Sequence, residues 1–183
     1  MAQQARQRAV VLSFEHVLTV GMPSGGDKAL NLAASARAGD IAWIGDAQRI
    51  DDVRNFFRSL EQAGVAVILV SEQCLESIIL AVLRFLELMG CVSCILDSRA
   101  CGVGSGGGGG GCGGGSAAAA KQKLVAQLIE QHAMTAEDIV LLDHDTEWLR
   151  SSGCRIVHVR GGRGMGQQEM QKALLLLGLI EDH

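Results

Sequence analysis

Two polar side chains, Ser13 and Glu15, directly follow a short apolar run at residues 9–12 and are the first candidates for chemistry in this sequence. A run of that length bounded by polar residues predicts a strand that is buried on both faces of a parallel sheet. Ligands of such sheets bind just beyond the carboxyl ends of the strands. Ser13 and Glu15 therefore lie where a ligand or substrate would be expected.

A serine hydroxyl becomes a strong nucleophile only when a base removes its proton. His16 and His144 both follow predicted strands, so either could approach Ser13 at the same edge of the sheet. No Gly-x-Ser-x-Gly turn surrounds Ser13, although that turn is the usual signal of a serine hydrolase built on an α/β sheet. A Ser–His mechanism stays open, but a polar end to the strand without catalysis is favoured.

The rest of the chain alternates between predicted strands and amphipathic helices. Strands are predicted at 65–70, 91–96, 139–143 and 155–159, and helices at 49–63, 75–89, 121–132, 146–152 and 167–177. Residues 41–44 fit either a short strand or the approach to a helix. This alternation is typical of a doubly wound α/β domain with helices on both faces of a parallel sheet.

Two segments interrupt the alternation within what we predict to be a single domain, 1–183. Residues 21–44 are weakly patterned and are predicted to be a surface insertion. Residues 102–120 consist mainly of Gly and Ala and are predicted to be a flexible tether. The same composition is typical of engineered linkers, which would carry no function.

Composition and charge exclude several classes of protein. A net charge of −4 gives no electrostatic case for nucleic-acid binding, and 3% aromatic residues provide few surfaces for base stacking. The RGGRG segment at 160–164 resembles RNA-binding Arg-Gly segments, but one copy is more typical of a loop. The start of the chain lacks a signal-peptide pattern, and no stretch has the roughly 20 apolar residues of a membrane span. We therefore expect a cytoplasmic protein that binds neither nucleic acid nor membranes; its oligomeric state stays open.

Four segments in order resemble the four motifs of the haloacid-dehalogenase-like (HAD-like) hydrolases. They are SFEHVLT at 13–19, Ser71 after the strand at 65–70, Lys121, and DHDTE at 143–147. The chain is similar to the small magnesium-dependent phosphatases of that superfamily over nearly its whole length, most strongly over residues 45–96. The resemblance implies an α/β fold with a three-layer, doubly wound parallel sheet, a small insertion and no large cap domain.

The first motif departs from the family pattern, which reads Asp-x-Asp-x-Thr. Ser13, Glu15 and Val17 stand at those three positions. In the family the first Asp attacks phosphorus, and the second protonates the leaving group and then activates water. A hydroxyl at Ser13 offers neither a carboxylate nucleophile nor an anionic oxygen for Mg²⁺. Glu15 could still act as an acid, but a displacement of about 1 Å can cost on the order of 100-fold in rate.

The resemblance implies a phosphate site formed by Ser71 and Lys121, with Lys123 as the alternative if the register is shifted by two residues. Ser71 would hydrogen-bond the phosphoryl group, and Lys121 would neutralise its developing charge. We predict that Lys121 opens a helix, a position that favours anions. With Ser13 and Glu15, Lys121 completes the implied catalytic set.

The resemblance also implies a Mg²⁺ site at the fourth motif, formed by Asp143 together with Asp145 or Glu147. His144 interrupts the Asp-Asp pair that is common in the family. Weak Mg²⁺ binding and a solvated acidic turn are therefore both open.

The spacing Cys91-x-x-Cys94, with Cys101 and Cys112 downstream, raises the question of a zinc site. Residues three apart in a strand point to opposite faces, and Cys112 lies in the Gly-rich segment. We therefore favour buried free thiols at Cys91 and Cys94.

The leading hypothesis is a catalytically impaired relative, a pseudophosphatase, which is retained for binding a protein partner or a phosphorylated ligand. The alternatives are an active Mg²⁺-dependent phosphomonoesterase with an atypical first motif and a structural component of a larger assembly. The sequence favours the first because Ser13 stands where phosphoryl transfer requires a carboxylate.

Overall fold

The computed structural model describes residues 7–20, 28–40, 42–72, 74–97, 117–131, 134–145, 152–160 and 162–181. Most of the Gly-rich segment and most of the helix predicted at 146–152 lie outside these ranges. The predictions for those two segments stay predictions.

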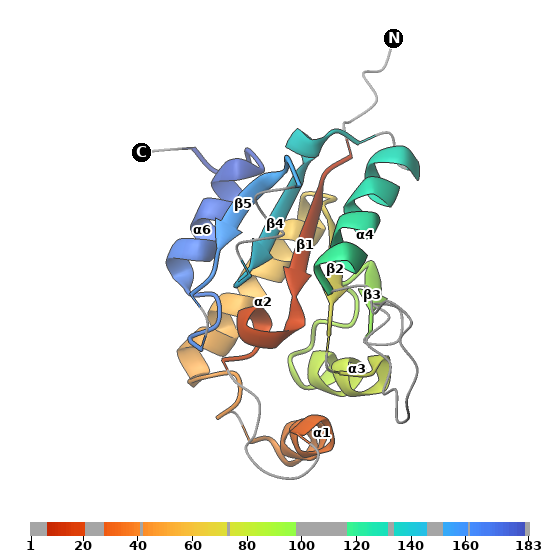
Figure 1. The fold of residues 1–183 in the computed structure, drawn as a ribbon. Coiled ribbons are helices and arrows are strands. Elements are labelled where there is room, and N and C mark those ends of the chain that lie inside the picture. The colour runs from red at the N-terminus through yellow and green to blue at the C-terminus, as the bar shows by residue number, and fades with distance from the viewer. Residues whose placement is uncertain are drawn as a thin grey trace, which may run out of the picture.

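One parallel sheet forms the centre of the molecule (Figure 1). Its strand order is β3-β2-β1-β4-β5, so β1 is central and lies between β2 and β4. The strands are β1 (Ala9–Ser13), β2 (Ala66–Val70), β3 (Cys94–Leu96), β4 (Ile139–Asp143) and β5 (Arg155–His158). This order confirms the predicted doubly wound α/β fold, because the chain moves outward from β1 first to one side and then to the other.

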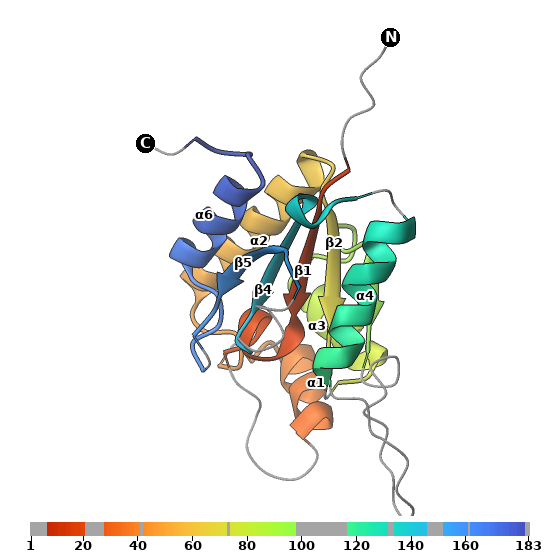
Figure 2. The same ribbon diagram turned by 45° about the horizontal axis from the view of Figure 1, so that its top comes forward.

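Helices cover both faces of the sheet, which gives three layers (Figures 1 and 2). Val10 and Leu12 of β1 pack into the larger apolar cluster, which also holds the buried side chains of α2, α3 and α6. Val11 of β1 points to the other face, into a smaller cluster with α4. The helices are α2 (Ala47–Gln62), α3 (Glu76–Phe85), α4 (Ala117–Gln131) and α6 (Gln167–Leu176), with single turns η1 (Phe14–Leu18) and η2 (Ala136–Asp138). None of the described helices is long and apolar enough to cross a membrane.

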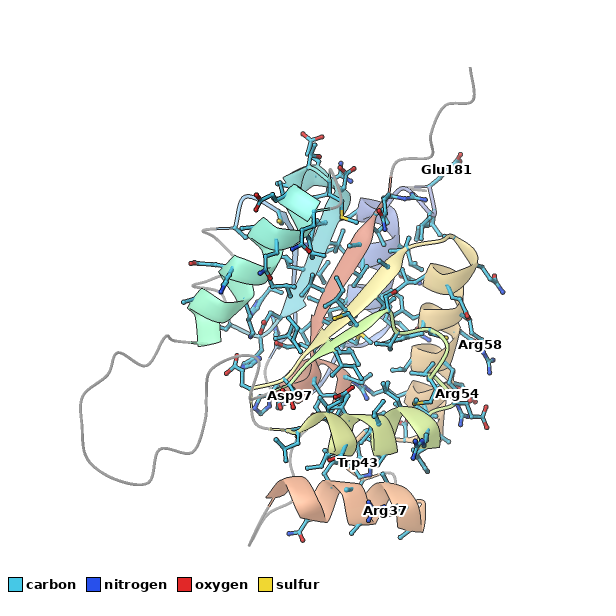
Figure 3. The ribbon with its side chains drawn as sticks, turned by 90° about the vertical axis from the view of Figure 1, so that its right-hand side faces the viewer. Arg37, Trp43, Arg54, Arg58, Asp97 and Glu181 are labelled. Carbon is cyan, nitrogen blue, oxygen red and sulfur yellow. The ribbon has the colours of Figure 1, made fainter. Side chains whose placement is uncertain are left out.

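A further helix, α1 (Lys28–Ala38), lies within the segment predicted as a surface insertion. It packs beside α3 and buries Leu32 and Ala36 in the larger cluster. Trp43 lies between α1 and α3, where its ring centroid is 5.8 Å from that of Phe85 (Figure 3). Residues 42–44 form a turn, so the short strand considered for 41–44 is not formed over the described part.

Three local predictions need correction. Helix α4 begins at Ala117, and Lys121 therefore lies inside the helix instead of opening it. The preceding alanines were assigned to the tether, although Ala is the strongest helix former. Strand β3 begins at Cys94 and not at residue 91, and Cys94 is exposed while Cys91 is buried. Cys94 is exposed because the short strand β3 forms the edge of the sheet.

Arg49, in the first turn of α2, joins three segments of the chain at the carboxyl edge of the sheet. Its guanidinium donates to the main-chain oxygens of Val17 and Leu18 in η1, both at 3.1 Å. It also donates to the oxygens of Ile44, before α2, and of Met165, before α6. Burial lowers the pKa of Arg49 to about 10, against the opposing effect of nearby Asp46. The group remains charged at neutral pH and holds the turn after β1 in place.

Gly164 lies directly against this guanidinium. Its φ of +65° is in the left-handed region, and a Cβ atom added there would lie 2.8 Å from Cζ of Arg49. A glycine is therefore required at this position both for its backbone conformation and for the close approach of Arg49.

We expect Arg49→Met to lower the free energy of unfolding by about 2–4 kcal/mol, because several partly buried carbonyl oxygens lose their donor. Arg58→Met on the exposed side of α2 is the matched control and should change it by about 0.5 kcal/mol or less. Urea denaturation of the three proteins measures both effects. Equal losses in the two variants would contradict the role assigned to Arg49.

Candidate functional site

The carboxyl ends of the three central strands bring together most of the polar residues that the sequence singled out. Ser13 ends β1, Ser71 directly follows β2, and Asp143 ends β4. Lys121 reaches this edge from α4, on the smaller-cluster face of the sheet. These four side chains are buried, with exposed fractions of 4% or less. Neighbouring parallel strands end at the same edge of the sheet, which explains the convergence.

Ser13, Lys121 and Asp143 form a closed hydrogen-bonded group. The Ser13 hydroxyl donates to Oδ2 of Asp143 at 2.7 Å and accepts from Nζ of Lys121 at 3.1 Å. The ammonium also donates to Oδ2 of Asp143 at 2.6 Å. Oδ1 of Asp143 accepts the main-chain N–H groups of His144 and Asp145 at 2.7 and 3.0 Å. Four donors thus face the four acceptor positions of one carboxylate.

The Lys121 ammonium also forms an ion pair with the carboxylate of Glu72, whose Oε1 lies 2.7 Å from Nζ. The ammonium has three N–H donors, and they match the three oxygens around it, from Ser13, Asp143 and Glu72. Sequence reasoning missed Glu72, although its place next to Ser71 at the end of a strand was the available signal.

Glu15 points toward the β2 side of the site. Its Oε1 accepts from the Ser71 hydroxyl at 2.5 Å, and its Oε2 accepts from the main-chain N–H of Glu72 at 3.2 Å. The Ser71 hydroxyl in turn accepts from the N–H of Cys74 at 2.9 Å. His16, next to Glu15, has a φ of +62°, which is costly for a residue with a Cβ atom and often marks a functional segment.

Charges within the group stabilise each other. Burial by itself would lower the pKa of Lys121, but the carboxylates of Asp143 and Glu72 outweigh it and raise that pKa. Burial would likewise raise the pKa of Asp143, yet Lys121, the N–H of Asp145 and the Ser13 hydroxyl hold it below its usual value. Lys121 and Asp143 are therefore an ion pair at neutral pH.

Comparison with known proteins gives matches in structure and not in sequence. No protein-family model and no curated protein match the chain. The HAD domain of effector protein Lem4 from Legionella pneumophila aligns at 16% identity and a TM-score of 0.58, over 92% of this chain and 94% of that one. The chain has the fold of the HAD-like hydrolases.

Two further structures extend the comparison. An uncharacterized protein from Corynebacterium glutamicum aligns at 15% identity and a TM-score of 0.52, over 97% of this chain and 99% of that one. The core domain of a candidate phosphoglycolate phosphatase from Streptococcus pneumoniae aligns at 10% identity and a TM-score of 0.50, over 91% and 94%. The predicted HAD-like fold is confirmed, and identities this low carry no statement about activity.

The described side chains at this edge of the HAD-like fold do not by themselves fit a Mg²⁺ site. Mg²⁺ requires near-octahedral oxygen coordination, usually with one or two carboxylates. Asp143 already has both oxygens hydrogen-bonded, and the Lys121 ammonium lies where a cation would approach Oδ2. Within the described ranges no group of three His, Cys, Asp or Glu side chains could hold a metal ion. Glu147 lies outside those ranges.

The two alternative ligands of the HAD-like motifs, Lys123 and Asp145, differ in their distance from the closed group. Lys123 is exposed on the outer side of α4 and does not enter the site. Asp145 is partly exposed, and its main-chain N–H supports Asp143. Their roles in binding phosphate or Mg²⁺ stay predictions.

His16 and His144 do meet at this edge, with ring centroids 4.7 Å apart. Neither ring pairs with Ser13, whose hydroxyl bonds are made with Asp143 and Lys121. Nδ1 of His144 lies 3.1 Å from Oδ1 of Asp143, and Nδ1 of each ring is buried without a hydrogen bond in the described part of the chain. The geometry gives no Ser–His pair for nucleophilic catalysis.

Lys121→Met tests the closed group, because it leaves the carboxylates of Asp143 and Glu72 without their ammonium. We expect a loss of about 3–5 kcal/mol in the free energy of unfolding near neutral pH. Lys123→Met makes the same change at an exposed position of the same helix and should cost about 0.5 kcal/mol or less.

The sign of the pH dependence gives a second readout for Lys121→Met. In the wild type, the lowered pKa of Asp143 contributes stability that is present above the usual carboxyl pKa of about 4 and is lost in stronger acid. In the variant, burial should raise this pKa above its unfolded value, so the variant gains stability as pH falls. Urea denaturation at about pH 8 and about pH 5 should therefore show a smaller difference from wild type at the lower pH. A pH-independent difference would contradict this assignment.

Proposed function

We propose that this chain is a pseudophosphatase, a HAD-like protein that does not hydrolyse phosphomonoesters and acts by binding a protein partner or a phosphorylated ligand. One observation carries the proposal: Ser13, Lys121 and Asp143 bond to one another, and Glu72 takes the remaining ammonium position. The groups that would attack or stabilise a phosphoryl group are thus paired within the protein.

Among the residues that the structure describes, no base is placed to make Ser13 a nucleophile. Its hydroxyl proton points to Asp143, whose lowered pKa makes that carboxylate a weak proton acceptor. Lys121 donates to the same hydroxyl oxygen and so stabilises its electron pair. Attack on phosphorus from Ser13 would therefore require this group to open and a different base to enter.

The electrostatics of the buried group also disfavour a phosphoryl dianion. An anion placed beside Lys121 would meet the carboxylates of Asp143 and Glu72, and Glu15 lies next to Ser71. Like charges at such distances repel strongly in a buried site. We therefore place neither a bound Mg²⁺ ion nor a phosphoryl transfer step at this edge of the sheet.

Hydrolysis of p-nitrophenyl phosphate in the presence of Mg²⁺ tests the proposal. We expect wild type and Glu15→Ala to give the same rate, within about twofold, because Glu15 takes part in no turnover. Equal residual rates in the two proteins come from a contaminating phosphatase. A Mg²⁺-dependent rate that disappears in Glu15→Ala would establish the active phosphomonoesterase instead.

Ser13→Asp tests why the group is closed. It places a second carboxylate beside Asp143, so the variant should be less stable without metal and should gain a cation site. We expect millimolar MgCl₂ to raise its melting temperature by roughly 2–4 °C, which corresponds to about 1 kcal/mol in a chain of this size. Wild type should show no shift beyond that of NaCl at equal ionic strength. A Mg²⁺-specific rise in wild type of the same size would contradict the proposed site.

A further inference from the structure

A cavity of about 620 Å³ lies between the end of β5 and the start of α6. These elements form the edge of the molecule opposite β3 (Figure 1). The volume is in the range of small-molecule sites. Its lining includes His158, Arg160, Arg163 and Gln167, and no residue of the closed group around Lys121 contributes to it.

The cavity carries two guanidinium groups that form no ion pair with the described carboxylates. Arg160 and Arg163 are exposed, and within the described residues neither guanidinium has a hydrogen bond or an ion pair. One carboxylate, Glu169, contributes to the lining, and it accepts the main-chain N–H of Gly166 at 2.9 Å. Glu169 therefore caps the start of α6, and among the described residues it makes no ion pair with either arginine.

Main-chain hydrogen bonds at Met165 anchor the loop that carries these arginines to the turn after β1 and to Arg49. The main-chain N–H of Met165 donates to the oxygen of Val17 at 2.8 Å, and the oxygen of Met165 accepts from Arg49 at 3.2 Å. Gly164 lies against the Arg49 guanidinium, a third positive charge below the cavity. These contacts fix the main chain at Gly164 and Met165, whereas the two exposed arginine side chains of this loop lose rotamer freedom when they bind a ligand.

The chemistry of the lining identifies the class of ligand. Guanidinium groups bind phosphate oxygens in a bidentate manner, and the start of α6 adds a partial positive charge. The amide of Gln168 can hydrogen-bond hydroxyl groups; the amide of Gln167 donates to Asp52 at 3.1 Å, and its oxygen can still accept. His158 contributes an imidazole ring, but no Phe, Tyr or Trp side chain is among the described lining residues, so a large stacking surface for a nucleobase is missing there.

We propose that this cavity binds a small phosphorylated polyol or sugar. This inference rests on the proposed function, which includes binding of a phosphorylated ligand, and it adds the chemical class of that ligand and its binding site. It does not depend on the absence of turnover, because the cavity and the closed group share no residue. The phosphatase assay and a binding titration can therefore fail separately.

Calorimetric titration with fructose 1,6-bisphosphate tests the proposal. We expect wild type to bind it and not fructose, and the double variant Arg160→Gln/Arg163→Gln to bind at least ~10-fold more weakly. Arg37→Gln, which removes one positive charge on α1 (Figure 3), should leave the affinity unchanged. Unchanged melting temperatures show that the exposed substitutions preserve the fold.

Four outcomes would overturn the proposal. They are no binding by wild type at millimolar ligand, equal binding by the double variant, an equal loss in Arg37→Gln, and tighter binding of an RNA oligomer than of the bisphosphate. Ser71→Ala separates the two sites, because a loss of binding in that variant would place the ligand at the carboxyl ends of β1 and β2, beside the closed group. Retained binding in Ser71→Ala, with amide NMR shifts confined to residues 158–169, would support the cavity.

Discussion

The buried ammonium of Lys121 is the interaction on which the candidate site depends. It links α4, on one face of the sheet, to the ends of β1 and β4 and to the residue after Ser71. A buried charge is tolerated only when opposite charges and hydrogen bonds compensate its lost hydration. Here three oxygens supply that compensation, so the same contacts that allow the group to be buried also leave it no donor for a ligand.

Ser13 is what allows this closed arrangement. A hydroxyl can donate to Asp143 and accept from Lys121 at once, which joins the two ends of the ion pair without adding charge. A carboxylate at the same position would add a negative oxygen beside Asp143 and would favour a bound cation. Available positive charge lies instead at Arg160 and Arg163, on a loop that Arg49 fixes to the turn after β1. The fold thus separates a charge-balanced centre from a cationic edge.

The fold was largely predictable because its signals are local. Runs of apolar residues identified β1, β2 and β4, and the buried faces of α2 and α3 follow a helical spacing. Errors arose where a local signal competed with another. The alanines before Lys121 were assigned to the Gly-rich segment, yet they extend α4, and the apolar run at residues 91–96 forms a strand only from Cys94. The placement of Cys94 at an exposed edge depends on the strand order, which hydropathy does not encode.

The sequence by itself determined that Ser13, Ser71 and Asp143 would converge, because the carboxyl ends of neighbouring parallel strands lie at one edge of the sheet. The resemblance to the HAD-like first motif further implied that a hydroxyl, Ser13, stands where the family has a carboxylate. Only the tertiary structure decided which groups pair there: Ser13 and Asp143 are 130 positions apart, and Lys121 and Ser13 are 108 apart. It alone revealed Glu72 on the ammonium and Arg49 beneath the glycine loop. Hydrogen bonds form between side chains within about 3 Å of each other, and that proximity is set by the packing of helices on the sheet and not by spacing along the chain.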